Sequence, residues 1–473
     1  MTAHVWVKDD GFLFTGIFSK QRAAFLNDGP PSAAARRADL AKLKQALLAR
    51  QTAIEAAVSK DFGYRAPYET RIMEINPIVQ TINYLRRNLT KWMRPERRRV
   101  ALHFRPGRTK VVYQPLGVIG IISPWNYPVS LALIPLATAI AAGNRAMLKP
   151  SEMTPATSEL LRSMLRELFP EDQVAVVTGG PEAGAAFARL PFDHLIFTGS
   201  TSVGRSVMKE AAGNLVPLTL ELGGKSPALI GPDADIEAAA TSIAFGKLAN
   251  AGQTCIAPDY AFVHEKDAAA FVAAFDATAR KFYPRGAADR NYTSIINAKH
   301  YNRLQKLIDD ARHKGAKIIE VSDAGNSDSR KFAPAIVLNV TDDMAIMQEE
   351  VFGPALPVMT YRNLDDAIGY VNRKPHPLAL YYFGKNSEDQ QKILMRTTSG
   401  NVTINDTLMH YVQDDLPFGG VGLSGMGAYH GHEGFKSLSH AKGVFQQSRW
   451  NFARILHPPF NKTTDMVIRY FQR

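Results

Sequence analysis

The sequence predicts an α/β fold with two doubly wound parallel sheets and a small additional β element. Short apolar runs typical of buried strands alternate with longer helical patterns along most of the chain. The 473 residues are enough for two large domains. No internal repeat or low-complexity segment interrupts the alternation.

The residues before the first buried strand are predicted to form two helices and a hairpin. Apolar residues recur at helical spacing over residues 31–59, and a second helix is predicted over residues 68–92. Residues 100–105 and 109–113 alternate apolar and polar side chains on either side of a Pro-Gly pair. This pattern predicts a hairpin that projects from the main body.

Strand patterns and helix patterns then alternate through the rest of the chain. The strands are predicted at residues 117–122, 145–149, 174–177, 194–197, 218–220, 261–263, 335–338, 356–361 and 378–383. The helices between them are predicted at residues 131–142, 154–168, 236–248, 268–283 and 301–314. Because ligands of such sheets collect beyond the carboxyl ends of the strands, polar residues that follow strands are candidate site residues.

The charge of the chain bears on its partners. There are 56 Lys and Arg against 44 Asp and Glu, a net charge of +12, which is compatible with nucleic acid or a membrane surface as partner. The basic residues are mostly dispersed, and the one dense run, at residues 94–99, has no aromatic platform beside it, so we interpret it as a solvated surface. Residues 446–473 mix apolar and basic side chains, which favours docking on the protein itself or a partner subunit over a membrane surface.

Neither a targeting signal nor a membrane span is recognisable. The start of the chain carries charges where a secretion signal needs an apolar core, and no apolar run is long enough to cross a bilayer. Together with the single cysteine, this predicts the reducing cytoplasm.

The single cysteine, Cys255, is either an inert small apolar residue or a reactive thiol. It cannot form an internal disulfide. Its neighbours Gly252, Gln253 and Thr254 are small or polar, whereas a structural cysteine more often lies in an apolar run. The local sequence leaves both interpretations open.

Two segments that follow predicted strands are candidates for binding a nucleotide. Residues 198–205 lead from a strand into a helix, and Gly199, Ser200 and Gly204 would let backbone N–H groups approach a phosphate. Lys149 suits phosphate or ribose hydroxyls, and Glu152 can accept from both hydroxyls of a ribose. A carboxylate there would repel a 2′-phosphate, which favours NAD over NADP. A tight turn, a solvated lysine and a glutamate at a helix start remain alternatives.

Two further polar residues are candidates for catalysis. Glu221 ends an apolar strand before two glycines and could act as a general base, although a solvated strand-end glutamate fits equally well. Asn126 lies between prolines and offers an amide donor for an oxyanion, but a turn asparagine is the simpler interpretation on local sequence.

Several common motifs are absent or misplaced. There is no HExxH and no cysteine pair, so we predict no metal site. The sequence also lacks the G-x-S-x-G elbow of serine hydrolases. Residues 420–425 match the glycine fingerprint for dinucleotides but follow no strand, so we predict a surface or hinge loop there.

Seven short segments together resemble the NAD(P)-dependent aldehyde dehydrogenase superfamily over nearly the whole chain. They are Pro124-Trp-Asn-Tyr-Pro128, Lys149-Pro-Ser-Glu152, Phe197-Thr-Gly-Ser200, Leu220-Glu-Leu-Gly-Gly-Lys-Ser-Pro227, Gly252-Gln-Thr-Cys255, Glu349-Glu-Val-Phe-Gly-Pro354 and Pro417-Phe-Gly-Gly420. The chain lacks a longer N-terminal extension, and Ser424-Gly-Met-Gly-Ala-Tyr-His-Gly431 is similar to the class 3 branch, which is usually dimeric. Residues 191–195 and 439–445 are most similar to coniferyl aldehyde dehydrogenases.

The resemblance implies a role for each candidate residue. Cys255 would attack the aldehyde as a thiolate, Asn126 would help to hold the oxyanion, and Glu221 would activate water. The implied cofactor-binding residues are Trp125, Lys149, Glu152, Gly199, Ser200, Gly204, Glu350 and Phe352. Of these, Glu350 would hold the nicotinamide ribose and Phe352 would pack against the nicotinamide.

The resemblance also implies a division of the chain and a substrate. Residues 1–94 and 118–222 would bind NAD, with NADP as an alternative, and residues 223–400 would form the catalytic domain. Residues 95–117 and 401–445 would form an oligomerisation element of a homodimer, followed by the tail at 446–473. The substrate would be an aryl or hydroxycinnamyl aldehyde such as coniferyl aldehyde, or a medium-chain aliphatic aldehyde.

Three other functions are compatible with parts of the sequence. A CoA-acylating aldehyde dehydrogenase shares the cysteine, but Glu221 argues against it because a base for water would be superfluous. The charge of +12 supports a protein that binds nucleic acid or an anionic surface on this fold. A cysteine hydrolase without cofactor leaves the nucleotide segment unexplained.

Overall fold

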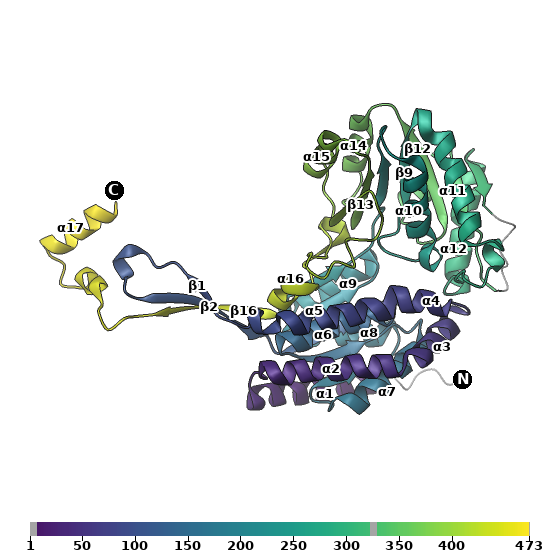
Figure 1. Cartoon of the computed structure of the whole chain (residues 1–473). Helices are drawn as coiled ribbons and strands as arrows, with labels where there is room; N and C mark the ends of the chain where they lie inside the picture. The colour runs from purple at the N-terminus through teal and green to yellow at the C-terminus, as the bar shows by residue number, and fades with distance from the viewer. Residues whose placement is uncertain (1–6, 322–328, 473) are drawn as a thin grey trace.

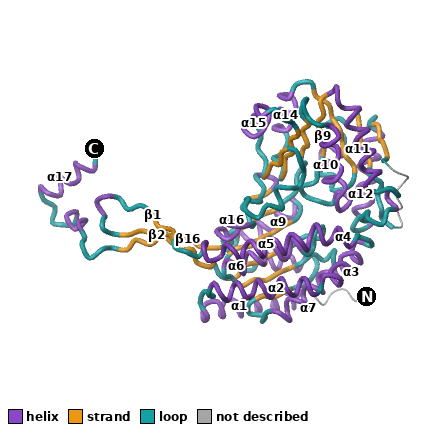
Figure 2. The backbone as a smooth tube through the Cα atoms, viewed as in Figure 1, coloured by secondary structure: helices purple, strands orange, loops and turns teal. Residues whose placement is uncertain are grey.

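The computed structural model describes residues 7–321 and 329–472 and shows a body of two lobes with a long arm (Figure 1). A six-stranded sheet forms the centre of one lobe and a seven-stranded sheet the centre of the other, and a three-stranded sheet forms the arm. Helices cover both larger sheets (Figure 2). The predicted α/β fold is therefore confirmed.

The N-terminal helices pack on the first lobe. They are α1 (Val7–Asp28), α2 (Ala33–Ala49), α3 (Gln51–Phe62), α4 (Pro67–Thr70), the π-helical turn η1 (Arg71–Ile75) and α5 (Asn76–Trp92). The helix predicted over 31–59 is thus two helices that meet at Arg50, and the one over 68–92 contains a π-turn. In the described residues, no helix combines the length and apolar character needed to cross a bilayer.

The first sheet is parallel except for one short edge strand. Its order is β15 (Gly425–Met426), β7 (Leu218–Glu221), β6 (His194–Thr198), β3 (Val118–Ile122), β4 (Arg145–Lys149) and β5 (Val174–Val176). Strand β3 is buried on both faces: Val118 and Ile122 belong to the core with α1, whereas Ile119 and Ile121 belong to the core with the buried helix α6 (Ser130–Ala142). From β3 the chain first builds β4 and β5 on one side and then β6 and β7 on the other. The carboxyl ends of β3 and β6 therefore flank a topological switch point, where ligands of α/β sheets bind.

The second sheet has the same organisation. Its order is β10 (Lys317–Glu320), β11 (Ala335–Leu338), β12 (Ala355–Tyr361), β9 (Tyr260–His264), β8 (Pro227–Ile230), β13 (Ala379–Phe383) and β14 (Asn401–Ile404), and all pairs are parallel except β10 with β11. The helices of both lobes that follow α6 are α7 (Pro155–Leu168), α8 (Pro181–Ala188), α9 (Thr201–Ala212), α10 (Ile236–Leu248), α11 (Ala268–Phe282), α12 (Ala298–His313), α13 (Ala345–Gln348), α14 (Leu364–Arg373), α15 (Ser387–Arg396) and α16 (Gly431–Ser437).

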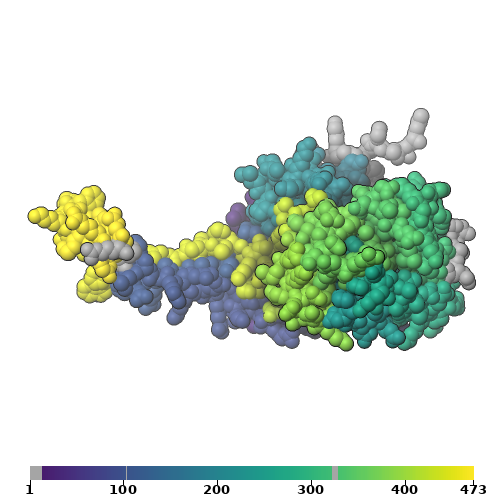
Figure 3. Space-filling view, turned by 90° about the horizontal axis from the view of Figure 1, so that it is seen from above, coloured from purple at the N-terminus to yellow at the C-terminus, as the bar shows by residue number. Residues whose placement is uncertain are grey.

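The arm differs from the predicted hairpin in its strands. It contains β1 (Glu96–Arg98), β2 (Arg108–Pro115) and β16 (Ser439–Gln446), and it ends in α17 (Lys462–Phe471) well away from the body (Figure 3). Strand β1 lies before the predicted strand 100–105, because residues 102–104 form a 3₁₀ turn. The predicted segment 401–445 is also divided, since β14 joins the second sheet, β15 the first, and only β16 the arm.

The structure refines one local interpretation. Residues 420–425 are only in part a surface loop: Gly422 and Leu423 are exposed in a 3₁₀ turn, whereas Ser424 is buried and Gly425 pairs with Glu221 in the first sheet. Most basic residues are dispersed as predicted, since 43 of the 56 lie outside the arm, but the excess of positive over negative charge is concentrated there. Residues 94–115 and 439–473, which build the arm, hold 13 Lys and Arg against 2 acidic residues, a net charge of +11 in a chain of +12.

Candidate active site

The backbone before Cys255 is tightly constrained. The loop follows α10 through the turn η3 (Ala249–Gly252), in which Asn250 and Ala251 have the left-handed φ values 53° and 52°. Gly252 has φ 75°, and a Cβ there would lie 2.2 Å from the carbonyl oxygen of Gly353. Glycine is therefore required at this position by close backbone packing, and the loop that carries the thiol has little freedom.

The side chain of Gln253 anchors the same loop. Its Nε2 donates to the carbonyl oxygens of Asn250 (2.9 Å) and Ser294 (3.1 Å), and its Oε1 accepts from the backbone N–H of Ile296 (2.9 Å). All three bonds are buried. Gln253 thus holds the backbone two residues before Cys255 and has a structural role.

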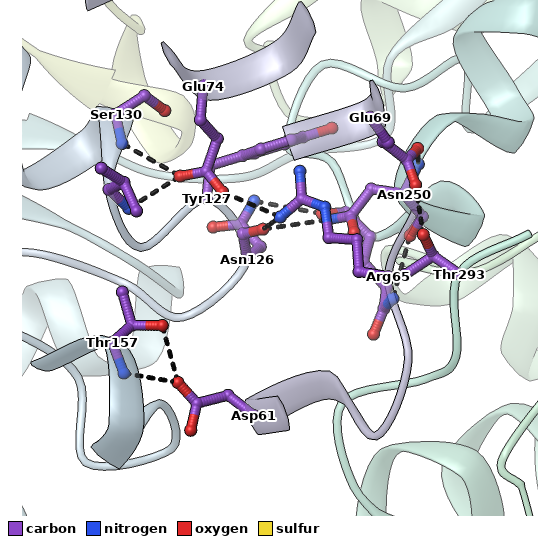
Figure 4. A network of polar contacts seen from close by, with 12 residues as sticks. Asp61, Arg65, Glu69, Glu74, Asn126, Tyr127, Ser130, Thr157, Asn250 and Thr293 are labelled. Atoms are coloured by element: carbon purple, nitrogen blue, oxygen red, sulfur yellow. Dashed lines mark hydrogen bonds and ion pairs between the residues drawn. The ribbon is translucent and has the colours of Figure 1, made fainter. Parts of the chain in front are cut away.

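Asn126 joins the end of β3 to the cysteine loop. Its buried side-chain Nδ2 donates to the backbone carbonyl oxygen of Gln253 at 3.1 Å. The backbone carbonyl oxygen of Asn126 accepts from Asn250 Nδ2 at 3.0 Å and from Arg65 Nη1 at 3.3 Å (Figure 4). A side-chain amide has two N–H donors, so the second can serve a substrate oxygen. The sequence prediction that Asn126 and Cys255 belong to one site agrees with these contacts.

An apolar cavity of about 120 Å³ leads to Cys255. Its wall includes Met73, Tyr127, Leu131, Phe245, Leu408 and Tyr411. Of the described residues, those that line it include no charged side chain. Tyr127, next to Asn126, lies in this wall, whereas Tyr260 is buried in the core of the second lobe against Phe262 and Tyr370.

The environment of Cys255 disfavours its thiolate. The side chain is only partly exposed, and burial raises the pKa of the thiol to about 12. The carboxyl groups of Glu350 and Glu221 contribute to this rise, while backbone N–H groups of Cys255 and Ile256 oppose it. The thiol is therefore protonated near neutral pH until something removes the proton or adds positive charge.

Glu221 is a buried carboxyl group at the end of β7. Its side chain is 2% exposed, and burial raises its pKa well above the ordinary range. Neither carboxyl oxygen has a hydrogen-bond partner in the described part of the chain. A neutral, unpaired carboxyl group next to a thiol is rare in a core and is typical of a general acid or base.

Glu350 lies beside the segment that follows Glu221. A Cβ on Gly223 would lie 2.1 Å from Glu350 Oε2, so this carboxyl rests against the glycine backbone. Burial and the nearby Asp259 raise the pKa of Glu350 to about 8. Glu350 precedes β12 of the second sheet, and the loops of both lobes thus meet around Cys255.

Trp125 and Phe352 form an aromatic wall in the same region. Their rings pack edge to face with centroids 5.4 Å apart, and Trp125 also lies 5.0 Å from the ring of His300. Phe352 has a φ of 47°, which a bulky residue adopts only when the surrounding structure enforces it. The two predicted cofactor residues therefore come together at the junction of the lobes.

The other predicted cofactor residues lie at the carboxyl edge of the first sheet. Lys149 ends β4, and its buried Nζ lies 3.5 Å from the partly exposed Glu152. Burial lowers the pKa of Lys149, and Glu152 opposes that shift. Ser200 caps α9 by accepting from the N–H of Val203 at 3.4 Å.

The two predicted phosphate-loop glycines also have packing reasons. A Cβ on Gly199 would lie 2.7 Å from the ring of Phe197, and one on Gly204 would lie 2.7 Å from Leu222. A larger residue at either position would therefore require Phe197 or Leu222 to shift, whether or not a phosphate binds there.

Three functional candidates escaped the sequence analysis. Arg65, Glu69 and Glu74 are charged residues near the candidate site, and Arg65 and Glu74 are fully buried in an ion pair of 2.9 Å. The signal available in the sequence was weak: Glu74 occupies an apolar position of a helical pattern. Apart from the Arg65–Glu74 pair itself, the hydrogen-bond partners of these residues lie 55 to 224 positions away and cannot be inferred from spacing.

The profile of the aldehyde dehydrogenase family matches residues 19–444 of the chain. The chain belongs to the aldehyde dehydrogenase family. Among aldehyde dehydrogenases, it is 51% identical over 452 residues to a protein of Pseudomonas aeruginosa named "Probable coniferyl aldehyde dehydrogenase", covering 96% of this chain and 94% of the relative. It is 46% identical to the coniferyl aldehyde dehydrogenase of another Pseudomonas strain, covering 91% and 90%.

Solved aldehyde dehydrogenase structures have the same fold. The substrate-bound AldH of Staphylococcus aureus aligns with a TM-score of 0.92 at 37% identity, covering 97% of this chain and 99% of that one. The Mycobacterium tuberculosis aldehyde dehydrogenase in complex with NAD+ aligns with a TM-score of 0.85 at 30% identity, covering 93% and 91%. The resemblance drawn from the sequence motifs is confirmed, and the chain is an aldehyde dehydrogenase.

Proposed function

We propose that this enzyme oxidises its aldehyde to the carboxylic acid with NAD, and that Cys255 is the nucleophile. The observation that carries the proposal is the junction where the Asn126 amide, the buried carboxyl of Glu221 and the thiol of Cys255 meet beside an apolar cavity. A thiol, an oxyanion donor and an acid–base group are the parts that acyl chemistry on an aldehyde needs.

In this proposal the Cys255 thiol first releases its proton to solvent, the sulfur then adds to the aldehyde carbon, and the aldehyde oxygen takes up the negative charge. The second N–H of Asn126 and the backbone N–H of Cys255 hold that oxygen, and loss of one such donor typically costs about 3 kcal/mol in the barrier. NAD, when bound, supplies the acceptor for the hydride that leaves this carbon. Glu221, once ionised, takes a proton from water, whose oxygen attacks the resulting thioester and releases the acid and the thiolate.

The residues present fit a dinucleotide. Lys149 is a buried cation whose nearest partners are the carbonyl oxygen of Pro150 and Glu152, so it retains capacity for ribose hydroxyls. Ser200 and the first turn of α9 offer donors for a phosphate at the switch point of the sheet. Glu152 beside Lys149 disfavours a 2′-phosphate, which supports NAD over NADP, and the M. tuberculosis relative carries NAD+.

The cavity supports an apolar aldehyde, and we propose coniferyl aldehyde or a related hydroxycinnamaldehyde. Its wall is formed by aliphatic and aromatic side chains, and the hydroxyl groups of Tyr127 and Thr254 hydrogen-bond each other at 2.7 Å. Such a lining suits an aromatic ring. The relatives named for coniferyl aldehyde support this choice, and medium-chain alkanals remain the alternative.

An aldehyde panel with NAD and NADP supplied separately tests these proposals. We expect hydroxycinnamaldehydes with NAD to give the highest kcat/KM, and a preference for alkanals or NADP would reject the finer assignment. Cys255→Ala should abolish NADH formation while NAD still binds, and full activity in that variant would reject the mechanism. If acyl-CoA forms instead of free acid, the CoA-acylating alternative is correct.

We propose that the arm joins two copies of the chain into a homodimer. The support is a set of large exposed apolar side chains on this element: Leu102, Trp450, Phe452, Phe460, Met466 and Tyr470. Such side chains are typical of a surface that a partner covers. Light scattering should show that the whole chain is a dimer and that a form ending at residue 445 dimerises with a higher dissociation constant. A monomeric whole chain would reject the proposal.

The charge of the arm favours a second candidate function, attachment to an anionic surface. Residues 94–115 and 439–473 carry a net charge of +11, and their exposed aromatic side chains suit a lipid interface. Co-sedimentation with anionic vesicles, compared with zwitterionic ones and with duplex DNA, tests it. Salt-sensitive binding to the anionic vesicles alone would support attachment, and an absence of vesicle binding would reject it.

A further inference from the structure

One ten-residue segment, residues 65–74, contacts both loops of the active site. It leads from α3 through α4 into η1. Ile72 and Met73 line the cavity, and no other side chain of the segment has a part in the reaction described above. We propose that Arg65, Glu69 and Glu74 form a brace that fixes the Asn126 loop against the Cys255 loop. Arg65 is then a positioning residue for the oxyanion donor. This inference rests on the proposed function, in which Asn126 holds the oxyanion.

Arg65 provides the first contact of the brace. Its Nη1 donates to the Asn126 carbonyl oxygen at 3.3 Å and to Glu74 Oε1 at 2.9 Å (Figure 4). The guanidinium lies 4.9 Å from the ring centroid of Tyr127 and 5.3 Å from that of Phe62, so it also packs on the residue after Asn126. The side chain is completely buried.

Stability alone does not explain this arginine. Its Nε and Nη2 are buried without a hydrogen-bond partner in the described residues. Desolvation of a buried ion pair often outweighs its attraction, and a well-packed apolar residue frequently stabilises a fold as much. Only Nη1 of Arg65 forms hydrogen bonds, and we infer that the arginine is present to hold the groups that Nη1 contacts, Glu74 and the Asn126 backbone.

Glu74 holds the other end of the Asn126 loop. Its Oε2 accepts from the backbone N–H groups of Val129 (2.7 Å) and Ser130 (3.0 Å), where helix α6 begins. The Arg65–Glu74 pair therefore forms hydrogen bonds with the backbone on both sides of Tyr127. A shift of this pair would move the loop as a unit.

Glu69 extends the brace to the nucleophile. Its carboxylate accepts from the backbone N–H of Asn250 and from the hydroxyl of Thr293. The side chain of Asn250 in turn donates to the carbonyl oxygens of Asn126 (3.0 Å) and Gln253 (3.1 Å). The left-handed backbone of Asn250 is thus held by Glu69, and through it the loops of the two lobes share one network.

The brace has a mechanistic consequence. An oxyanion donor must point at the oxygen that becomes charged, and a misplacement of about 1 Å costs about 100-fold in rate. Without Arg65 the backbone carbonyl of Asn126 keeps only the bond from Asn250, so the backbone that carries the amide is held less firmly, although Nδ2 keeps its bond to the Gln253 carbonyl oxygen. We expect the step that forms the oxyanion to slow, while NAD affinity and the hydrolysis of the thioester change little.

The test measures the first-turnover burst of NADH in the whole enzyme for Arg65→Met and Glu69→Gln. We expect the burst rate of Arg65→Met to fall about 30- to 100-fold with an unchanged Kd for NAD, and Arg65→Lys to recover part of it. Arg36→Met is the matched control. Arg36 is also a buried arginine of this lobe, and it contacts only the carbonyl oxygens of Pro31 and Ala141 among the hydrogen bonds described.

A double-mutant cycle separates positioning from general stability. If Arg65 acts through Asn126, Arg65→Met with Asn126→Ala should be no slower than Asn126→Ala alone, to within about twofold. The brace is overturned if the losses of burst rate in the two single variants multiply in the double variant. It is also overturned if Arg36→Met lowers the burst rate as much as Arg65→Met does. Should Arg65→Met fail to fold, Glu69→Gln with Asn126→Ala answers the same question. A normal burst in Asn126→Ala alone would instead overturn the proposed function.

Discussion

We predict that Cys255 is nearly unreactive in the enzyme without cofactor. Its pKa of about 12 lies three above the ordinary value of 9.0, which corresponds to about 1,000-fold less thiolate near neutral pH. Because the thiolate is the species that alkylates, iodoacetamide should label the native enzyme about 1,000-fold more slowly than an ordinary thiol. Since Cys255 is the only cysteine, mass spectrometry of the whole chain reports this rate directly.

The causes of the shift give the controls. The rate should rise about tenfold per pH unit throughout the neutral range, since the folded pKa lies far above it. Glu350→Gln and then Glu221→Gln should accelerate labelling at alkaline pH, where these carboxyl groups are ionised and raise the thiol pKa in addition to burial. NAD should accelerate it as well, through the positive charge of its nicotinamide ring. Labelling of the native enzyme without NAD at the rate of the unfolded chain would refute the reasoning.

Further variants test the base, the loop, the cavity and the nucleotide site. Glu221→Gln should keep the NADH burst and lower steady-state turnover about 100-fold or more, and quenched-flow detection of the thioester checks this. Gly252→Ala should destabilise the fold by about 3 kcal/mol, because its Cβ meets the Gly353 carbonyl and φ is 75°, and the thermal midpoint measures it. Leu131→Trp should raise KM for hydroxycinnamaldehydes about tenfold and affect propanal less. Lys149→Met should raise the Kd for NAD at least about tenfold, as calorimetry can measure.

Local patterns were sufficient for most of the two lobes. The helix predicted at 236–248 and the strand predicted at 145–149 have the bounds of α10 and β4. Both are apolar segments with a clear boundary signal at the start. Asp235 is the N-cap of α10, and Gly143 with Asn144 separates α6 from β4. Where capping and apolar pattern agree, local sequence determines the element.

The elements that the sequence analysis assigned wrongly depend on pairing between residues far apart in the chain. The strand Asn401–Ile404 has a pattern that suits either the arm or the second sheet, and only its parallel pairing with β13 decides between them. The same limit applies to the site. Local sequence left Cys255 and Asn126 open, and only the motifs shared with the aldehyde dehydrogenase family predicted roles for them, whereas Arg65 contacts Asn126 across 61 positions and carries no local signal.

The buried carboxyl groups around the active site differ in their hydrogen-bond partners. Glu74 lies behind the Asn126 loop, where it accepts from Arg65 and from the backbone N–H groups of Val129 and Ser130. Glu221 has no hydrogen-bond partner in the described residues. Burial raises the pKa of both carboxyl groups, and it raises that of Glu350 to about 8. A single reactive thiol can remain protonated in such a site until substrate and cofactor arrive.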